Sequence, residues 1–159
     1  MDTSLQSFFN YIEFEKRYSK HTLEAYRNDL SQFQIFLTPY EKQLAEVNHL
    51  DIRSWIVTLM EQKISARSVN RKISALKSFY KFLLRKGLIK KSPLAKVQTP
   101  KTSKRLPVFV EITGIEKLLK GIDFPEGEEG RGDRWSSELL YNTGIRRSEL
   151  INLKISDFD

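Results

Sequence analysis

The chain has 159 residues, of which 40% are hydrophobic, enough for one good core or two small cores joined by a linker. It contains no cysteine and only two histidines, His21 and His49, which excludes a disulfide framework and argues against a metal site. We find neither a secretory signal nor an apolar run of membrane-spanning length. We therefore expect a cytoplasmic protein with no membrane contact and no cofactor.

The net charge of +7 is concentrated in the first part of the chain. Residues 1–105 hold 20 Lys and Arg against 9 Asp and Glu, whereas residues 106–159 hold 7 against 11. No acidic residue occurs between Glu61 and Glu111, a stretch that carries 14 Lys and Arg. A polyanion is the simplest partner for such a surface.

Residues 1–87 are predicted to form four helices, because apolar residues recur there at three- and four-residue steps. The first helix is expected over Ser4–Arg17. The second is expected to begin after Ser19, a good N-cap, and to end at Pro39. Together with the next two helices they predict a mainly α domain.

The third and fourth helices also have clear start signals. Asn48 and Asp51 stand in the N-cap and N3 positions of the third helix. The fourth is expected over Ser65–Lys86, with Gly87 as its C-terminal stop. It is the longest predicted helix.

Residues 88–107 are predicted to be a basic linker, because prolines and scattered lysines replace the helical pattern. A second, mostly helical domain is expected over residues 108–159. Trp135 and Tyr141 are expected in its core. Its predicted elements are a helix over Thr113–Lys120, a Gly- and Glu-rich loop over Gly121–Gly132, and helices over Asp133–Asn142 and Arg146–Leu153.

One face of the fourth helix is predicted to carry a line of cations separated by small serines. Val69, Ile73 and Leu76 mark the opposite, core side. Serines allow close approach to a groove, while the long cations reach phosphates or guanine edges, so the pattern indicates the major groove of double-stranded DNA. The face consists of Arg67, Arg71, Ser74, Ser78, Lys81 and Arg85, with Asn70 and Lys77 along one margin.

A solvated helix face is the alternative interpretation of that line of charges. It is disfavoured because the helix carries no acidic partner at a four-residue step, so its cations repel one another. The start of the second helix adds further candidate DNA contacts, near backbone N–H groups that can hold a phosphate. These are Lys20, His21, Thr22 and Arg27, of which His21 is equally well interpreted as a surface or capping residue.

A specific motif lies in the second part of the chain, where residues 143–150 read Thr-Gly-Ile-Arg-Arg-Ser-Glu-Leu. This is similar to box I of the tyrosine recombinases, the phage-integrase and Xer-like DNA breaking-rejoining enzymes, which reads Thr-Gly-(Leu/Ile/Met)-Arg-x-(Ser/Gly)-Glu-Leu. Residues 19–30 and 65–80 resemble the second and fourth helices of that family's core-binding domain. The resemblance implies a SAM-like four-helix domain followed by a linker and the start of a catalytic domain.

The resemblance also implies a chemistry and a role for Arg146. In the family this arginine grips the scissile phosphate while a tyrosine attacks it to form a 3′-phosphotyrosine, without metal or ATP. A planar guanidinium suits that role because it donates two hydrogen bonds to phosphate oxygens. The alternative is an arginine that pairs with Glu149. The family's other catalytic residues follow box I, and none has a match here, so we expect this chain not to cleave DNA.

Three functions remain open from the sequence. The first is the DNA-binding part of a site-specific recombinase, with double-stranded DNA and further recombinase protomers as partners. The second is a stand-alone DNA-binding regulatory protein. The third is a helical interaction module whose basic face docks an acidic protein.

Overall fold

The computed structural model describes residues 3–102 and 111–157, which fall into two compact units divided at Lys104 and Arg105. The described residues contain helices and no strand, which confirms the mainly α prediction. None of their helices is both long and apolar enough to cross a membrane. The predicted start of the second domain at residue 108, and the linker residues 103–107, lie outside the described residues.

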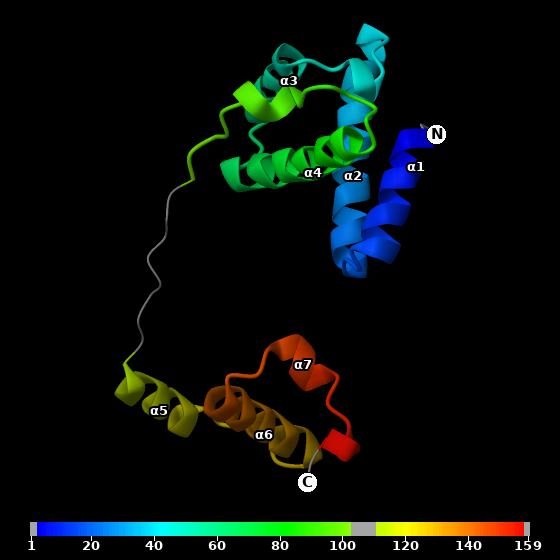
Figure 1. Cartoon of the computed structure of the whole chain (residues 1–159). Coiled ribbons are helices and arrows are strands. Elements are labelled where there is room, and N and C mark those ends of the chain that lie inside the picture. Colours follow the sequence, from blue (N-terminus) through cyan, green and yellow to red (C-terminus); the bar gives the residue numbers. More distant parts are fainter. Residues whose placement is uncertain (1–2, 103–110, 158–159) are drawn as a thin grey trace. The chain divides into compact units, whose positions relative to one another are not determined.

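The first unit begins with a helical pair (Figure 1). Helix α1 (Thr3–Asn10) continues into a π-helical turn, η1 (Tyr11–Glu15), and α2 (Lys20–Leu37) follows. Ser19 caps α2 as predicted, because its side chain accepts a hydrogen bond from the backbone N–H of Thr22. The short turns η2 (Thr38–Tyr40) and η3 (Leu44–Glu46) then connect to the third helix.

Helix α3 (His49–Glu61) starts at the predicted capping box. Asn48 accepts hydrogen bonds from the backbone N–H groups of Leu50 and Asp51, and the Asp51 carboxylate accepts one from the N–H of Asn48 at 2.9 Å. Burial alone would raise the pKa of Asp51, but this hydrogen bond and the ion pair with Lys42 outweigh it, so the pKa is lowered.

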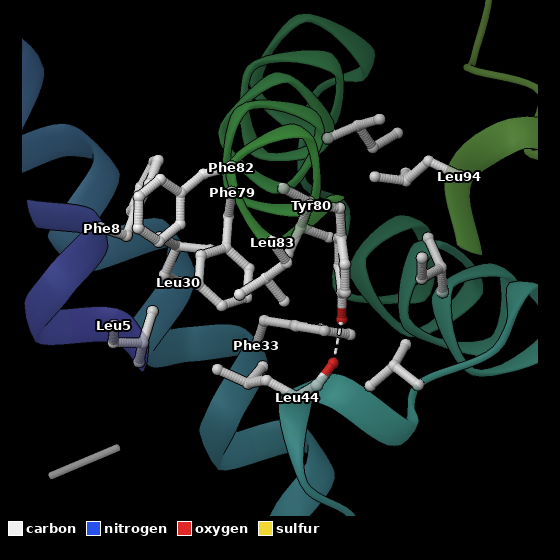
Figure 2. Close-up of a cluster of buried hydrophobic side chains, with 14 of the residues drawn as sticks. Leu5, Phe8, Leu30, Phe33, Leu44, Phe79, Tyr80, Phe82, Leu83 and Leu94 are labelled. Carbon is white, nitrogen blue, oxygen red and sulfur yellow. Dashed lines mark hydrogen bonds between the residues drawn. The ribbon is translucent and has the colours of Figure 1, made fainter. Parts of the chain in front are cut away.

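Helix α4 (Ala66–Arg85) is the centre of the first unit and packs on α1, α2 and α3. Ser65, expected as the first residue of this helix, is its N-cap, and Gly87 adopts a positive φ of 71° just beyond its end, in line with the predicted stop. Its buried face meets aromatic and aliphatic side chains of all three helices in one core (Figure 2). Tyr80, which is 1% exposed, donates a hydrogen bond from its hydroxyl to the Leu44 carbonyl at 2.9 Å.

Part of the predicted linker packs on the four-helix bundle. The turn η4 (Pro93–Lys96) contacts α3 and α4, with Leu94 buried and Ile89 and Val97 packed against the core. Farther along, the Asn70 side-chain amide donates a hydrogen bond to the Pro100 carbonyl at 2.9 Å. The chain therefore stays attached to α4 as far as Pro100.

The described residues of the second unit form three helices, α5 (Ile112–Gly121), α6 (Glu128–Thr143) and α7 (Arg147–Ile151), and the turn η5 (Ile155–Asp157). The prediction of a loop over Gly121–Gly132 was wrong in its second half, because α6 starts five residues earlier than expected. Glu128 and Glu129 stabilise its first turn through the helix dipole. Gly130 tolerates no side chain there, since an added Cβ would lie 1.7 Å from the Pro125 carbonyl oxygen.

The expected core of the second unit is not closed among the described residues. Trp135 is 72% exposed and Tyr141 is 41% exposed, so their prediction as core residues was wrong for this chain. Leu139, Leu140 and Leu150 are only half-buried. Among the residues of this unit whose burial the structure describes, only Gly130 is buried.

Candidate nucleic-acid interface

The predicted basic face forms a straight line along α4, which we call the basic stripe: Arg67, Arg71, Ser74, Ser78, Lys81 and Arg85. Successive members are four or three residues apart, so they share one side of the helix. All are exposed except Ser78, which is half-buried. The opposite side holds Val69, Ile73 and Leu76, each fully buried. The core thus fixes the direction in which the stripe faces.

Arg67, Lys77 and Lys81 are the unpaired cations of this helix: no ion pair is found for them among the described residues. Between Arg71 and Lys81 the stripe consists of the small side chains of Ser74 and Ser78. The Ser74 hydroxyl donates a hydrogen bond to the Asn70 carbonyl at 2.9 Å, so its side chain stays close to the helix backbone and does not project from the surface. Such a surface lets a groove approach closely while cations project on either side.

Arg71 differs from the other stripe residues because a buried carboxylate holds it from below. Asp29 on α2 is 1% exposed, forms an ion pair with Arg71 and accepts a hydrogen bond from Nζ of Lys72 at 3.1 Å. Lys72 is itself buried and also donates to Gln32. A buried charge of this kind is tolerated only when it is paired.

The pairing still leaves Arg71 available to a ligand. Its side chain is 49% exposed, and a guanidinium has five N–H donors, of which the described contact with Asp29 uses one nitrogen. The ion pair therefore orients Arg71 at the surface and does not neutralise the stripe as a whole.

The candidates at the start of α2 fall into two groups. Lys20 and His21 are exposed at the first two helical positions, whereas Thr22 is half-buried, with its hydroxyl 2.9 Å from that of Ser19 in the cap. Arg27 turns away toward the first helix, with its guanidinium carbon 4.9 Å above the ring of Phe9.

The structure links α2 to the stripe through Tyr26. Burial raises the pKa of Tyr26, and a hydrogen bond with Ser78 opposes that rise.

Asn70 has a structural contact that its place beside the stripe did not predict. Its amide N–H holds Pro100, and its carbonyl oxygen is buried without a hydrogen-bond partner among the described residues. Lys77, on the same margin, is exposed. Asn70 thus attaches the following segment to α4, whether or not it also contacts DNA.

Residues 5–87, the segment that holds α1 to α4, match the model of the phage integrase N-terminal SAM-like domain. The chain belongs to this family. Over its whole length it is also homologous to the Xer tyrosine recombinases. It is 39% identical to tyrosine recombinase XerC of Oceanobacillus iheyensis, over 100% of this chain and 52% of that protein.

Two further relatives are matched over similar extents. Tyrosine recombinase XerD of Staphylococcus haemolyticus is 35% identical over 99% of this chain and 53% of its own length. Tyrosine recombinase XerC of Bacillus subtilis is 37% identical over 96% of this chain and 50% of its own length. The chain spans about half the length of the curated relatives it matches.

Membership of the phage-integrase family directs attention to Arg146 in the second unit. Arg146 is the N-cap of α7, and its side chain is 80% exposed. Its guanidinium donates to Glu149 Oε1 at 2.9 Å, and its backbone N–H donates to Glu149 Oε2 at 3.0 Å. These two hydrogen bonds lower the pKa of Glu149. The paired Arg146 expected as the alternative is therefore the arrangement in this chain, and Glu149 supports the start of α7.

Asp29 and Lys72 are the residues of this interface that the sequence analysis missed. The signal was present, because each stands in the apolar register of its helix: Asp29 follows Tyr26 by three positions, and Lys72 follows Val69 by three. Two opposite charges, each at a core position of a different helix, indicate a buried ion pair.

Proposed function

We propose that this chain binds double-stranded DNA through the basic stripe of α4 and the start of α2, as the DNA-binding part of an Xer-like tyrosine recombinase. One observation carries the proposal. Four cations project from one exposed face of α4, with small serines between them and a fixed core behind them. DNA phosphates relieve the mutual repulsion of those cations, and counterion release drives the association.

The proposed contacts include every candidate from the sequence. Lys20, His21 and Thr22 lie at the N-terminal end of α2, where backbone N–H groups attract phosphate. Arg27 is the further proposed contact from α2, and Asn70 and Lys77 are margin contacts of the stripe. A cytoplasmic location and further recombinase protomers as partners belong to the same proposal.

The recombination chemistry is the wider part of the proposal. By analogy with the relatives' names, the whole enzyme breaks and rejoins DNA through a tyrosine, with Arg146 gripping the scissile phosphate. For Arg146 to do so, it has to exchange the Glu149 carboxylate for phosphate oxygens, which make charge-assisted hydrogen bonds of similar geometry.

The test is duplex binding by fluorescence anisotropy over a series of salt concentrations. The sequence alone suggests replacing Arg71 and Lys81, but Arg71 also pairs with buried Asp29, so its loss would change stability as well. We therefore choose Arg67→Gln with Lys81→Gln. Each lost phosphate contact should reduce the slope of log K against log salt by about 0.9.

The matched control is Lys90→Gln with Lys96→Gln, which removes the same charge from exposed lysines of the segment after α4. The control should bind like the unaltered chain. Equal binding by both double variants would contradict the proposal. Failure of the unaltered chain to bind any duplex at low salt would instead favour the interaction module with an acidic protein partner.

A further inference from the structure

A hollow of about 490 Å³ lies beside the C-terminal half of the basic stripe. Tyr11, Lys16 and Tyr18, from the segment that joins the first two helices, line one part of it. Ser78, Lys81 and Arg85 of α4 line the other part. The hollow therefore extends the stripe onto a second, sequence-distant segment that neither the DNA-binding prediction nor the family match assigns to a ligand.

The ring of Tyr11 brings two cations of this hollow together. The guanidinium carbon of Arg85 lies 5.2 Å from the centre of the ring, and Nζ of Lys16 lies 5.9 Å from it. Each cation is attracted to the ring face, but the two repel one another and Lys81. The hollow thus gathers three positive charges.

The described carboxylate nearest to these cations is a weak partner. A Glu15 carboxylate oxygen lies 4.0 Å from a guanidinium nitrogen of Arg85, and the two side chains are 60% and 62% exposed, respectively. An ion pair of this length and exposure contributes little, because solvent screens it. The hollow is therefore short of negative charge, and its lining residues include no carboxylate.

The hydroxyl of Tyr11 has a proton to donate. It accepts a hydrogen bond from Arg85 Nη1 at 2.7 Å, which leaves its own O–H free for an acceptor. The charged donor also polarises the hydroxyl and makes it a stronger donor. A phosphodiester fits this arrangement, since its two unesterified oxygens share one negative charge and accept several hydrogen bonds.

We propose that this hollow holds one backbone phosphate of the duplex, with Lys16 and the Tyr11 hydroxyl as its contacts from the N-terminal segment. The inference rests on the proposed DNA binding. Ser78, Lys81 and Arg85 belong to both surfaces, so a strand that follows the stripe passes the mouth of the hollow. The site extends the interface from α2 and α4 onto η1.

The first experiment compares Lys16→Gln with Lys90→Gln in the complete 159-residue chain, on one labelled duplex of mixed sequence. Both substitutions remove one exposed lysine charge and shorten the side chain by the same one atom. Lys16→Gln should weaken binding by about two- to fivefold, the size of one exposed ion pair. It should also lower the salt slope by about 0.9, whereas Lys90→Gln should change neither.

The second experiment uses Tyr11→Phe, which removes the hydroxyl and no charge. Affinity should fall while the salt slope stays the same, and the melting temperature of the variant checks that the fold is intact. Ethylation interference on a duplex selected from a random pool gives the position-specific measurement. Ethylation of one particular phosphate should weaken binding by the unaltered chain but not binding by Lys16→Gln. Ethylation of the other contacted phosphates should weaken binding by both proteins.

The outcomes separate this site from the proposed function. If Lys16→Gln binds like Lys90→Gln while Arg67→Gln binds more weakly, the stripe binds DNA and the hollow holds no phosphate, which overturns the inference alone. If the unaltered chain binds no duplex, both proposals are overturned. A fall in the melting temperature of Lys16→Gln that matches its loss of affinity would also overturn the inference, since the role of Lys16 would then be structural.

Discussion

The two units of this chain contain one tryptophan each, and the two tryptophans have opposite surroundings. Trp55 on α3 is 2% exposed and its ring centre lies 4.8 Å from that of Phe33 in the core. Trp135 on α6 is 72% exposed. The first unit has closed its core around large side chains, whereas the described part of the second unit leaves them in water.

The charged residues of the two units differ in the same way. Asp29 in the first unit is buried and pairs with cations of another helix, so it fixes how α2 and α4 lie against one another. The described ion pairs of the second unit, Arg134 with Glu138 and Arg146 with Glu149, join residues of the same short segment. The first unit therefore presents the basic stripe in a fixed orientation, while the described ion pair of Arg146 lies within its own turn.

The largest expected effect comes from Phe33→Ala, measured in a Trp135→Phe background so that Trp55 is the sole tryptophan. Phe33 is fully buried, and removal of such a ring leaves a cavity that costs about 3–5 kcal/mol of unfolding free energy. Urea unfolding followed by Trp55 fluorescence gives the value.

The matched variant in the other unit is Tyr141→Ala, with Trp135 retained and Trp55→Phe. Tyr141 is 41% exposed, so we expect a change within about 0.5 kcal/mol, as at other surface positions. A cooperative, strongly destabilised transition for Tyr141→Ala would mean that the second unit has a core of its own and would remove the contrast between the units.

Asp29→Asn is expected to lower the unfolding free energy by less than Phe33→Ala does. The amide has nearly the same shape but leaves buried Lys72 without a negative partner, which should cost about 3 kcal/mol of unfolding free energy. Adding Lys72→Met to Asp29→Asn should restore much of that loss, because it removes the unpaired charge and keeps an apolar chain of similar length. An unchanged unfolding free energy for Asp29→Asn would show that solvent reaches the ion pair, so that burial does not make the unpaired Lys72 costly.

The sequence was sufficient for the helices of the first unit because their local signals agree with their packing. Ser19, Asn48 and Ser65 each stand where a cap is needed, and the apolar steps of each helix match the buried residues. The exposed stripe followed from the same register. Contacts between distant segments were beyond this reasoning, since the pairing of Asp29 with Arg71 depends on how α2 crosses α4.

The second unit was harder to predict for a physical reason. The glycines Gly130 and Gly132 indicated a loop, but Glu128 and Glu129 ahead of them favour a helix start, and the close approach of Gly130 to Pro125 requires a glycine inside that helix. Trp135 and Tyr141 read as core residues because large aromatic side chains are usually buried. Burial needs a partner surface, and the sequence pattern of one helix does not reveal whether that surface is present.

An effect of about 1 kcal/mol is expected at Tyr80, whose hydroxyl sits in the core of the first unit. Burial, with a smaller contribution from Asp51, raises the pKa of Tyr80 above its ordinary value of 10.0. The folded protein keeps this proton at a pH where the unfolded chain loses it, so the unfolding free energy should fall as pH rises above 10, by up to about 1.4 kcal/mol per pH unit for this group.

Tyr80→Phe should cost about 1 kcal/mol at neutral pH, through the lost hydrogen bond to the Leu44 carbonyl, and should then lose stability less steeply above pH 10. Urea unfolding at pH 7 and at two alkaline values gives both effects. Tyr40→Phe is the control, because Tyr40 is 59% exposed and lies outside the core. If the unfolding free energies of Tyr80→Phe and the unaltered chain fall in parallel with pH, the Tyr80 hydroxyl reaches solvent. The core would then be more open on the side of α3 than on the side of α1, where Phe8 packs on Phe79.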